Sequence, residues 1–130
     1  MKDDNVFRAA SGLTGGIGGL NDTCGSLLGS SMVMGVVFGR PEKDTANKDK
    51  LMYSMALAGM LYKWYEKEFG SVKCRDICTR FAGGVFYDRN IPWQAELMKE
   101  ARIDSKCDDL VQKTAAKAAE MIWDGLHKSK

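Results

Sequence analysis

The sequence contains one histidine and two prolines among 130 residues, and it has no Cys-x-x-Cys pair. A single histidine argues against most hydrolytic metal sites and against a histidine-based proton relay. Without Cys-x-x-Cys, the thioredoxin and zinc-ribbon motifs are excluded, and without Cys-x-x-Cys-His a covalent c-type haem is excluded. The 19 basic and 17 acidic residues leave a formal net charge of +2, which gives no reason to expect nucleic acid.

Long apolar segments are missing as well. The longest uncharged stretch, residues 23–39, is shorter than the ~20 residues that span a bilayer, and glycine and serine occupy many of its positions. Residues 1–5 lack the basic start and apolar run of a signal peptide. We therefore expect a cytoplasmic protein without a membrane span, in which permanent disulfides are disfavoured and the cysteines are thiols, metal ligands or a redox pair.

Glycine and cysteine are the unusual components. Nine of the fourteen glycines lie between Gly12 and Gly39, and the chain has four cysteines. The composition, 45% hydrophobic and 28% charged, is that of a folded protein. Residues 1–130 are expected to form one domain.

The pattern along the chain predicts an all-α fold, a compact bundle of about five helices. Residues 6–11 resemble the end of a helix, and residues 13–20 a glycine-rich loop too flexible to hold regular structure alone. Thr23 is expected to cap a buried helix that ends at Gly39. Further helices are expected over residues 48–69, 71–81, 93–102 and from Ser105 onward, with residues 85–91 irregular. Gly70 is expected to end the first of them. In the first of these, apolar residues recur at helical spacing: Leu51, Met55, Ala58, Tyr62, Tyr65 and Phe69. On the inner face of the last helix we expect Leu110, Val111, Thr114, Ala115, Ala118, Met121 and Ile122.

Three cysteines fall at the expected helix starts. Cys24 follows Thr23, Cys74 follows a Ser71 cap and Cys107 follows a Ser105 cap. In a first helical turn, the helix dipole and free N–H groups stabilise a thiolate and lower the pKa of the thiol. Cys78 is four residues after Cys74, which places it on the same helix face; it is also the cysteine most easily read as an ordinary core residue.

Several motifs together resemble one family. They are Ala10-Ser11-Gly12-Leu13-Thr14-Gly15-Gly16-Ile17-Gly18, Thr23-Cys24-Gly25-Ser26-Leu27-Leu28-Gly29, Phe69-Gly70-Ser71-Val72-Lys73-Cys74-Arg75-Asp76, and Cys107 opening an alanine-rich helix. In order and spacing they resemble the redox-active C-GCAxxG-C-C family over nearly the whole chain. Ser26 stands where alanine is usual in that family. Many members also have an earlier helix with further cysteines, which this sequence does not include.

The resemblance implies that Cys24, Cys74 and Cys107 carry the chemistry. A similar helical module in split-Soret cytochromes c accompanies an iron centre. An iron–sulfur or other iron centre would here be ligated by Cys24, Cys74, Cys78 and Cys107, with Gly16, Gly18 and Gly25 as the positions where it approaches the backbone. The alternative is thiol–disulfide chemistry with a redox partner that the sequence does not identify. We favour thiol chemistry, because the earlier cysteine helix is absent.

A third hypothesis is that the chain is a non-catalytic module. A helical module could bind a partner or form a homodimer through its glycine and methionine faces, with Met52, Met55 and Met60 on one helix; core packing is the simpler explanation of those methionines. Arg80 and Arg89 near Gly83-Gly84 could meet an anion, although no pattern distinguishes them. A nucleotide site is disfavoured, because the glycine loop lacks the Gly-Lys-Ser/Thr ending of a phosphate loop.

Overall fold

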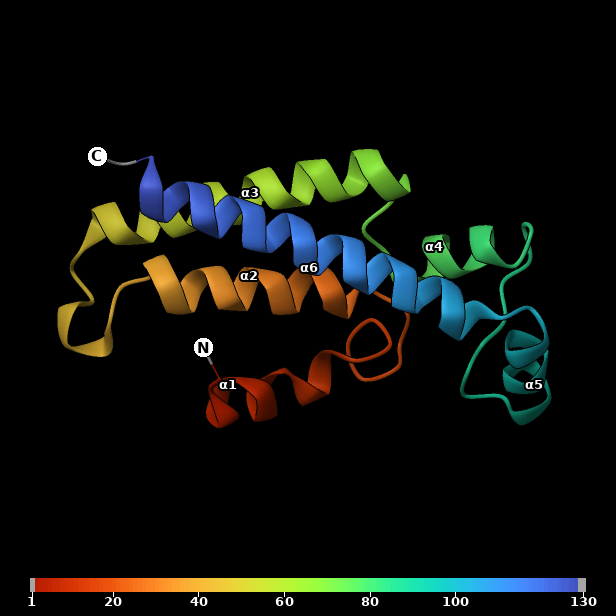
Figure 1. The fold of residues 1–130 in the computed structure, drawn as a ribbon. Helices are drawn as coiled ribbons and strands as arrows, with labels where there is room; N and C mark the ends of the chain where they lie inside the picture. The colour runs from red at the N-terminus through yellow and green to blue at the C-terminus, as the bar shows by residue number, and fades with distance from the viewer. Residues whose placement is uncertain (1, 129–130) are drawn as a thin grey trace.

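The computed structural model describes residues 2–128, and this part of the chain is helical without a strand (Figure 1). The sequence predicted an all-α fold of about five helices, and the described residues form six. The additional one is α1, which is a complete short helix rather than a helix end, because Asp3 caps it by accepting hydrogen bonds from the backbone N–H groups of Asn5 and Val6. The helices are α1 (Asp4–Ala9), α2 (Gly25–Phe38), α3 (Lys48–Phe69), α4 (Cys74–Phe81), α5 (Pro92–Glu100) and α6 (Ile103–His127), with 3-10 turns η1 (Ala10–Leu13) and η2 (Glu42–Asp44).

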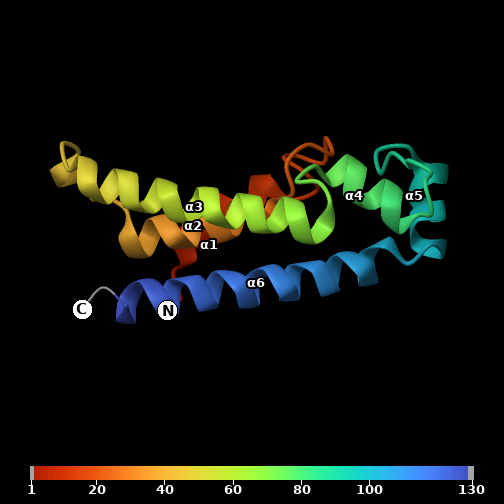
Figure 2. The same ribbon diagram turned by 90° about the horizontal axis from the view of Figure 1, so that it is seen from above.

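Helices α2, α3 and α6 run side by side and form the main body, while α4 and α5 lie together at one end of it (Figures 1 and 2). Asn47 caps α3. Gly70 ends the helix in the left-handed conformation, and this stop is the one that the sequence predicted. The core between the three long helices includes Leu27, Met34, Leu57, Leu61, Tyr65, Leu110, Ala118 and Met121.

The buried helix expected at residues 23–39 and the inner face expected on the last helix are only partly confirmed. Helix α2 is not buried throughout: only Leu27 and Met34 are, while Val33 and Val36 are exposed, because α3 and α6 cover one side of it. On α6, Val111 and Ala115 are exposed. On α3, the predicted stripe is divided, because Tyr65 is buried whereas Met55 and Tyr62 are exposed.

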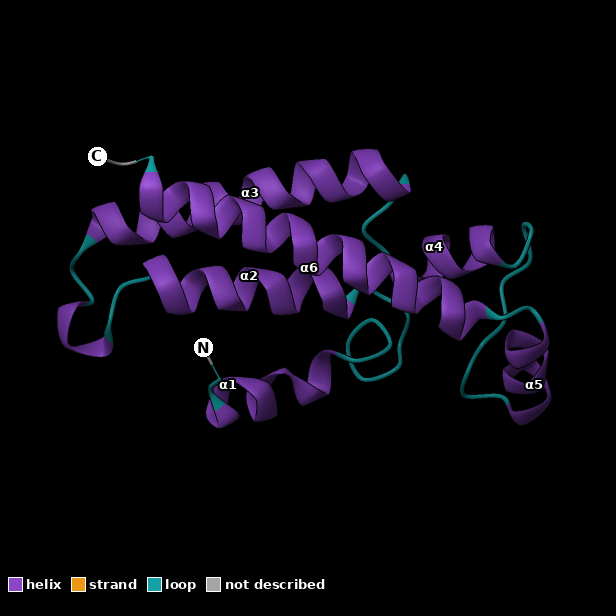
Figure 3. Ribbon diagram, in the orientation of Figure 1, coloured by secondary structure: helices purple, strands orange, loops and turns teal. Residues whose placement is uncertain are grey.

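The glycine loop has a defined conformation. Five consecutive residues, 15–19, have positive φ angles between 59° and 75°, so the chain makes one left-handed turn. Backbone hydrogen bonds close this turn, among them Gly19 N–H to the carbonyl of Thr14 at 3.0 Å and Asn21 N–H to that of Gly15 at 3.0 Å. The loop is the ring of teal ribbon that curls between η1 and α2 in Figure 3. Residues 14–20 thus form a loop without helix or strand, as expected, and hydrogen bonds close its turn.

Candidate thiol site

Cys74 and Cys78 form a close pair at the end of the molecule where α4 and α5 lie. Cys74 is the first residue of α4 and Cys78 lies one turn later, so both side chains project from one face, as the spacing predicted. Their Sγ atoms are 3.8 Å apart. Both residues are buried, together with Met98 and Ile103, in a small second core.

Cys107 joins this pair from α6. It is half-buried and packs against the second core, of which Cys78 is a member. The expected first-turn position of Cys107 is wrong: α6 begins at Ile103, preceded by Arg102 in the left-handed conformation, so Cys107 lies in the second turn. The sequence suggested a start at Ser105 because serine is a frequent cap, but a backbone turn at Arg102 starts the helix without one.

Cys24 occupies a separate position. It is the residue that precedes α2 rather than a member of its first turn. Its Sγ lies 3.2 Å from Ser26 Oγ, and that hydroxyl lies 3.3 Å from the hydroxyl of the fully buried Tyr65. Thr23 is not the cap, because it is held instead in an isolated antiparallel bridge with Lys73.

Residue Lys73, not Ser71, is the cap position of α4. Ser71 nevertheless organises this helix start. Its Oγ accepts a hydrogen bond from the N–H of Lys73 at 3.1 Å and donates one to the carboxylate of Asp76 at 2.7 Å. The sequence correctly indicated that Ser71 organises this helix start, but the cap position lies two residues later, at Lys73.

The glycine loop is what holds the start of α4 in place. The N–H of Cys74 donates to the carbonyl of Asp22 at 2.7 Å, and the N–H of Arg75 to that of Asn21 at 2.9 Å. A Cβ atom on Gly16 would lie 2.6 Å from the nitrogen of Asp22 and 2.7 Å from the Cβ of Cys74. Only glycine allows the loop to come this close to the cysteine.

The other two glycines expected at a bound centre differ from Gly16. At Gly25, a Cβ would lie 2.6 Å from the carbonyl oxygen of Leu13, so this glycine lets η1 pack against the start of α2. Around Gly18 there is open space, with no atom within 4 Å of the Cβ position. The structure thus explains Gly16 and Gly25 by close approach of chain segments, and Gly18 by its positive φ of 59°.

Arg89 completes the site, and the sequence gave no specific signal for it. Its Nη2 lies 3.4 Å from Cys74 Sγ and its Nε donates to Asn21 Oδ1 at 3.3 Å. The next residue, Asn90, donates from Nδ2 to the carbonyl of Gly19 at 3.1 Å. The irregular segment 85–91 is therefore fastened to both the glycine loop and the thiol pair. Arg80, by contrast, bonds the carbonyl of Phe69 away from the thiols.

The three neighbouring thiols differ in acidity. The hydrogen bond from Cys78 lowers the pKa of Cys107, because it stabilises the thiolate. Donating that hydrogen bond, together with burial, raises the pKa of Cys78 to about 11. The interaction with Cys78 and then burial raise the pKa of Cys74, although Arg89 acts in the opposite direction. The expectation that the start of a helix would lower the pKa of Cys74 is wrong, since an adjacent thiol and burial outweigh the helix dipole.

The described structure does not bring all four cysteines close enough together to bind one metal ion. Two thiolates on one tetrahedral ion at about 2.3 Å would be about 3.8 Å apart, and Cys74 and Cys78 have this spacing. Within residues 2–128, however, there is no group of three or more His, Cys, Asp or Glu side chains that could hold a metal ion. The spacing of Cys74 and Cys78 fits two ligands of one metal ion, and the described residues do not bring a third ligand to this pair.

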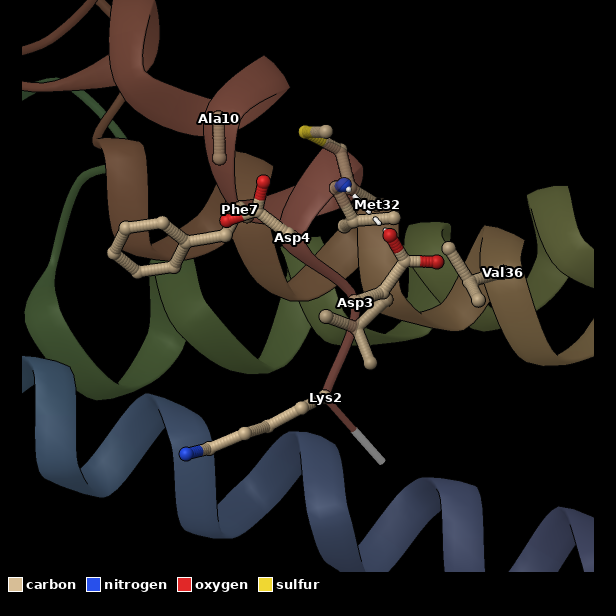
Figure 4. A pocket seen from close by; sticks show the side chains of 10 residues that line it. Lys2, Asp3, Asp4, Phe7, Ala10, Met32 and Val36 are labelled. Carbon is tan, nitrogen blue, oxygen red and sulfur yellow. Dashed lines mark hydrogen bonds between the residues drawn. The ribbon is translucent and has the colours of Figure 1, made fainter.

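One hollow on the described surface lies elsewhere. It is an apolar groove of about 520 Å³ between α1 and α2, lined by Phe7, Met32, Val33 and Val36 and edged by Asp3 and Asp4 (Figure 4). None of its lining residues is a cysteine. Among residues 2–128, no helix is both long enough and apolar enough to cross a membrane.

Comparison with known proteins gives one result. The family model described as "Putative redox-active protein (C_GCAxxG_C_C)" matches residues 1–121. No curated protein and no solved structure matches the chain significantly.

Proposed function

This chain belongs to the C_GCAxxG_C_C family of redox-active proteins, and from that premise we propose that it exchanges thiols and disulfides through Cys107 and Cys78. The observation that carries the proposal is the packing of the half-buried Cys107, from α6, against the small core that contains the buried Cys78 of α4. A two-cysteine exchange needs this arrangement: an accessible thiolate that attacks and a protected thiol that resolves the intermediate.

Cys107 is the attacking residue. Its thiolate is stabilised by the Cys78 hydrogen bond, and it is the more accessible member of the pair. It attacks one sulfur of a disulfide substrate, forms a mixed disulfide with it and expels the other sulfur as a thiolate, which takes up a proton from water. Lowering the thiol pKa raises the fraction of Cys107 that is ready to attack near neutral pH.

Cys78 completes the exchange. Its thiol loses a proton and attacks the Cys107 sulfur, so that a Cys78–Cys107 disulfide forms and the second substrate thiolate leaves. The two protein thiols have been oxidised and the substrate disulfide has been reduced to two thiols, a transfer of two electrons, and an external dithiol returns the pair to its reduced state. Cys74 supports the step, because a hydrogen bond from its thiol stabilises the Cys78 thiolate that must form.

Cys74 and Cys78 are a poor alternative pair in spite of their short separation. Residues four apart on a helix have Cβ atoms about 5–6 Å apart, whereas a disulfide needs about 3.5–4.5 Å. A bond between them would require the first turn of α4 to unwind. Cys24 has no step in this proposal, since its thiol is directed to Ser26.

The test is a set of four single Cys→Ser variants, each equilibrated in glutathione buffers and analysed by peptide mapping. We expect the Cys78–Cys107 disulfide in the unmodified chain and in Cys24→Ser, which serves as the matched control. Cys107 should react first with iodoacetamide at pH 7, and a further variant, Cys78→Ala, should slow that reaction because alanine has no hydrogen-bond donor. A different disulfide, or four thiols that stay unreactive until the chain unfolds, would refute the proposal.

The Cys74–Cys78 spacing favours a second candidate function, a cysteine-ligated iron centre. Cys74 and Cys78 would be its first two ligands, and bound iron would supply one-electron redox chemistry. Anaerobic purification followed by an absorption spectrum and assays for iron, zinc and acid-labile sulfide distinguishes the candidates. Stoichiometric iron and sulfide would establish the centre and overturn the dithiol proposal, whereas metal-free protein with two reactive thiols would do the reverse.

A further inference from the structure

Helix α3 carries an exposed apolar stripe along its outer face. Met52, Met55 and Tyr62 are 60%, 56% and 43% exposed, and Gly59 lies between them on the same face. The spacing of three, four and three residues is that of a seam at which two helices pack. With the charged residue at each end, the stripe consists of Lys48, Met52, Met55, Gly59, Tyr62 and Glu66.

Nothing in the described chain accounts for this stripe. The inner face of α3 packs through Leu57, Leu61 and Tyr65, and α3 forms an outer edge of the molecule (Figure 1). No atom lies within 4 Å of the Cβ position of Gly59, so packing inside the chain does not require a glycine that weakens the helix by about 1 kcal/mol relative to alanine. A contiguous exposed apolar surface of this kind is typical of an interaction site.

The charges at the two ends are also unfavourable for α3 itself. Lys48 is the first residue of the helix and Glu66 lies in its last turn, where the helix dipole disfavours a positive and a negative charge, respectively. Neither side chain forms an ion pair with another described residue. A partner that carries the opposite charge at each end would give both residues a role.

We propose that the α3 stripe binds the same stripe of a second copy, with the two helices antiparallel about a twofold axis. Aligning Met52 with Tyr62 of the other copy brings Met55 opposite Gly59, so that a large side chain enters the space left by the glycine. The same alignment places Lys48 opposite Glu66 at both ends. In this one register, apolar side chains meet, a large side chain faces a glycine, and opposite charges face each other.

The order of the charges along the stripe favours a second copy as the partner and an antiparallel orientation of the two helices. In a parallel pair, Lys48 would face Lys48 and Glu66 would face Glu66, and like charges repel. An unrelated partner would need to reproduce the same order of charges in reverse, whereas a second copy has it by symmetry. This inference does not depend on the thiol chemistry, because none of the four cysteines lies on α3.

The experiment is sedimentation velocity of the full chain between 1 and 200 µM, in the presence of a reductant so that disulfides do not contribute. We expect a concentration-dependent dimer. Lys48→Glu and Glu66→Lys should each weaken it about tenfold, because each converts two attractive pairs into two repulsive ones. An equimolar mixture of the two variants should restore the dimer, since every Glu then faces a Lys.

Thermal unfolding shows whether a variant associates less because its surface has changed or because its fold has been destabilised. Both charge reversals favour the helix dipole, so each variant should unfold at or above the temperature of the unmodified chain while it associates more weakly. Lys113→Glu, an exposed reversal on α6, is the matched control and should leave the dimer unchanged. A chain that stays monomeric at 200 µM, or a dimer that the control and the α3 variants weaken equally, overturns the proposal. So does a mixture that fails to restore association.

Discussion

Replacing Gly16 with alanine should destabilise the chain and release Cys74 from its position. The substitution has two costs. A residue with a Cβ pays about 1–2 kcal/mol in the left-handed conformation, and Gly16 has φ 73°. The new Cβ would also lie 2.6 Å from the Asp22 nitrogen and 2.7 Å from Cys74 Cβ, and crowding of this kind costs about 1–3 kcal/mol. The free energy of unfolding should therefore fall by about 2–5 kcal/mol.

Gly18→Ala is the matched control for this prediction. Gly18 has φ 59° but open space around its Cβ position, so alanine there pays only the conformational cost of about 1–2 kcal/mol. Urea unfolding followed by circular dichroism gives both values, and iodoacetamide labelling of Cys74 in the folded state should accelerate in Gly16→Ala alone. Equal destabilisation by the two variants, with Cys74 equally protected, would refute the assigned contact between the loop and the cysteine.

Three further changes test the environment of the thiols. Arg89→Ala should destabilise the chain by about 1–3 kcal/mol and expose Cys74 to alkylation, measured by urea unfolding and mass spectrometry; an unchanged labelling rate would contradict the contact. The free energy of unfolding should fall as the pH rises above 9. Cys78 keeps its proton to a pKa of about 11 in the folded chain, against an ordinary 9.0, so above pH 9 the folded chain binds more protons than the unfolded chain. Unfolding curves of Cys78→Ala should lack this part of the decline. Tyr65→Phe should cost only about 0.5–1.5 kcal/mol, the contribution of a hydrogen bond, against about 3–5 kcal/mol for Tyr65→Ala; equal losses in thermal melts would mean that the hydroxyl contact with Ser26 matters more than ring burial.

Local signals in the sequence were sufficient for much of the fold. The spacing of apolar residues and the stop at Gly70 predicted α3 over residues 48–69, which is the observed helix. The separation of four residues placed Cys74 and Cys78 on one face, and their sulfur atoms are in contact. These features depend on helix geometry alone, so no knowledge of the tertiary structure was needed.

Features that depend on neighbouring segments were not predictable in this way. Helical spacing does not indicate which of two apolar stripes on α3 faces inward, because Met55 and Leu57 both belong to a regular series. The contact of Cys107 with Cys78 requires α6 to cross α4. Arg89 belongs to a segment without periodicity, and its bond to Cys74 depends on how residues 85–91 fold back on the glycine loop.

The left-handed turn at residues 15–19 has a consequence for which residues the chain can accept there. Over this segment, the backbone has the handedness that a chain of D-amino acids would adopt. Every chiral residue in the genetic code is an L-amino acid, so substitutions at Gly15, Gly16, Gly18 and Gly19 all work against the backbone. In a chain made by chemical synthesis, a D-alanine at Gly18 would match the handedness of the turn, and it should stiffen the segment that holds the thiols.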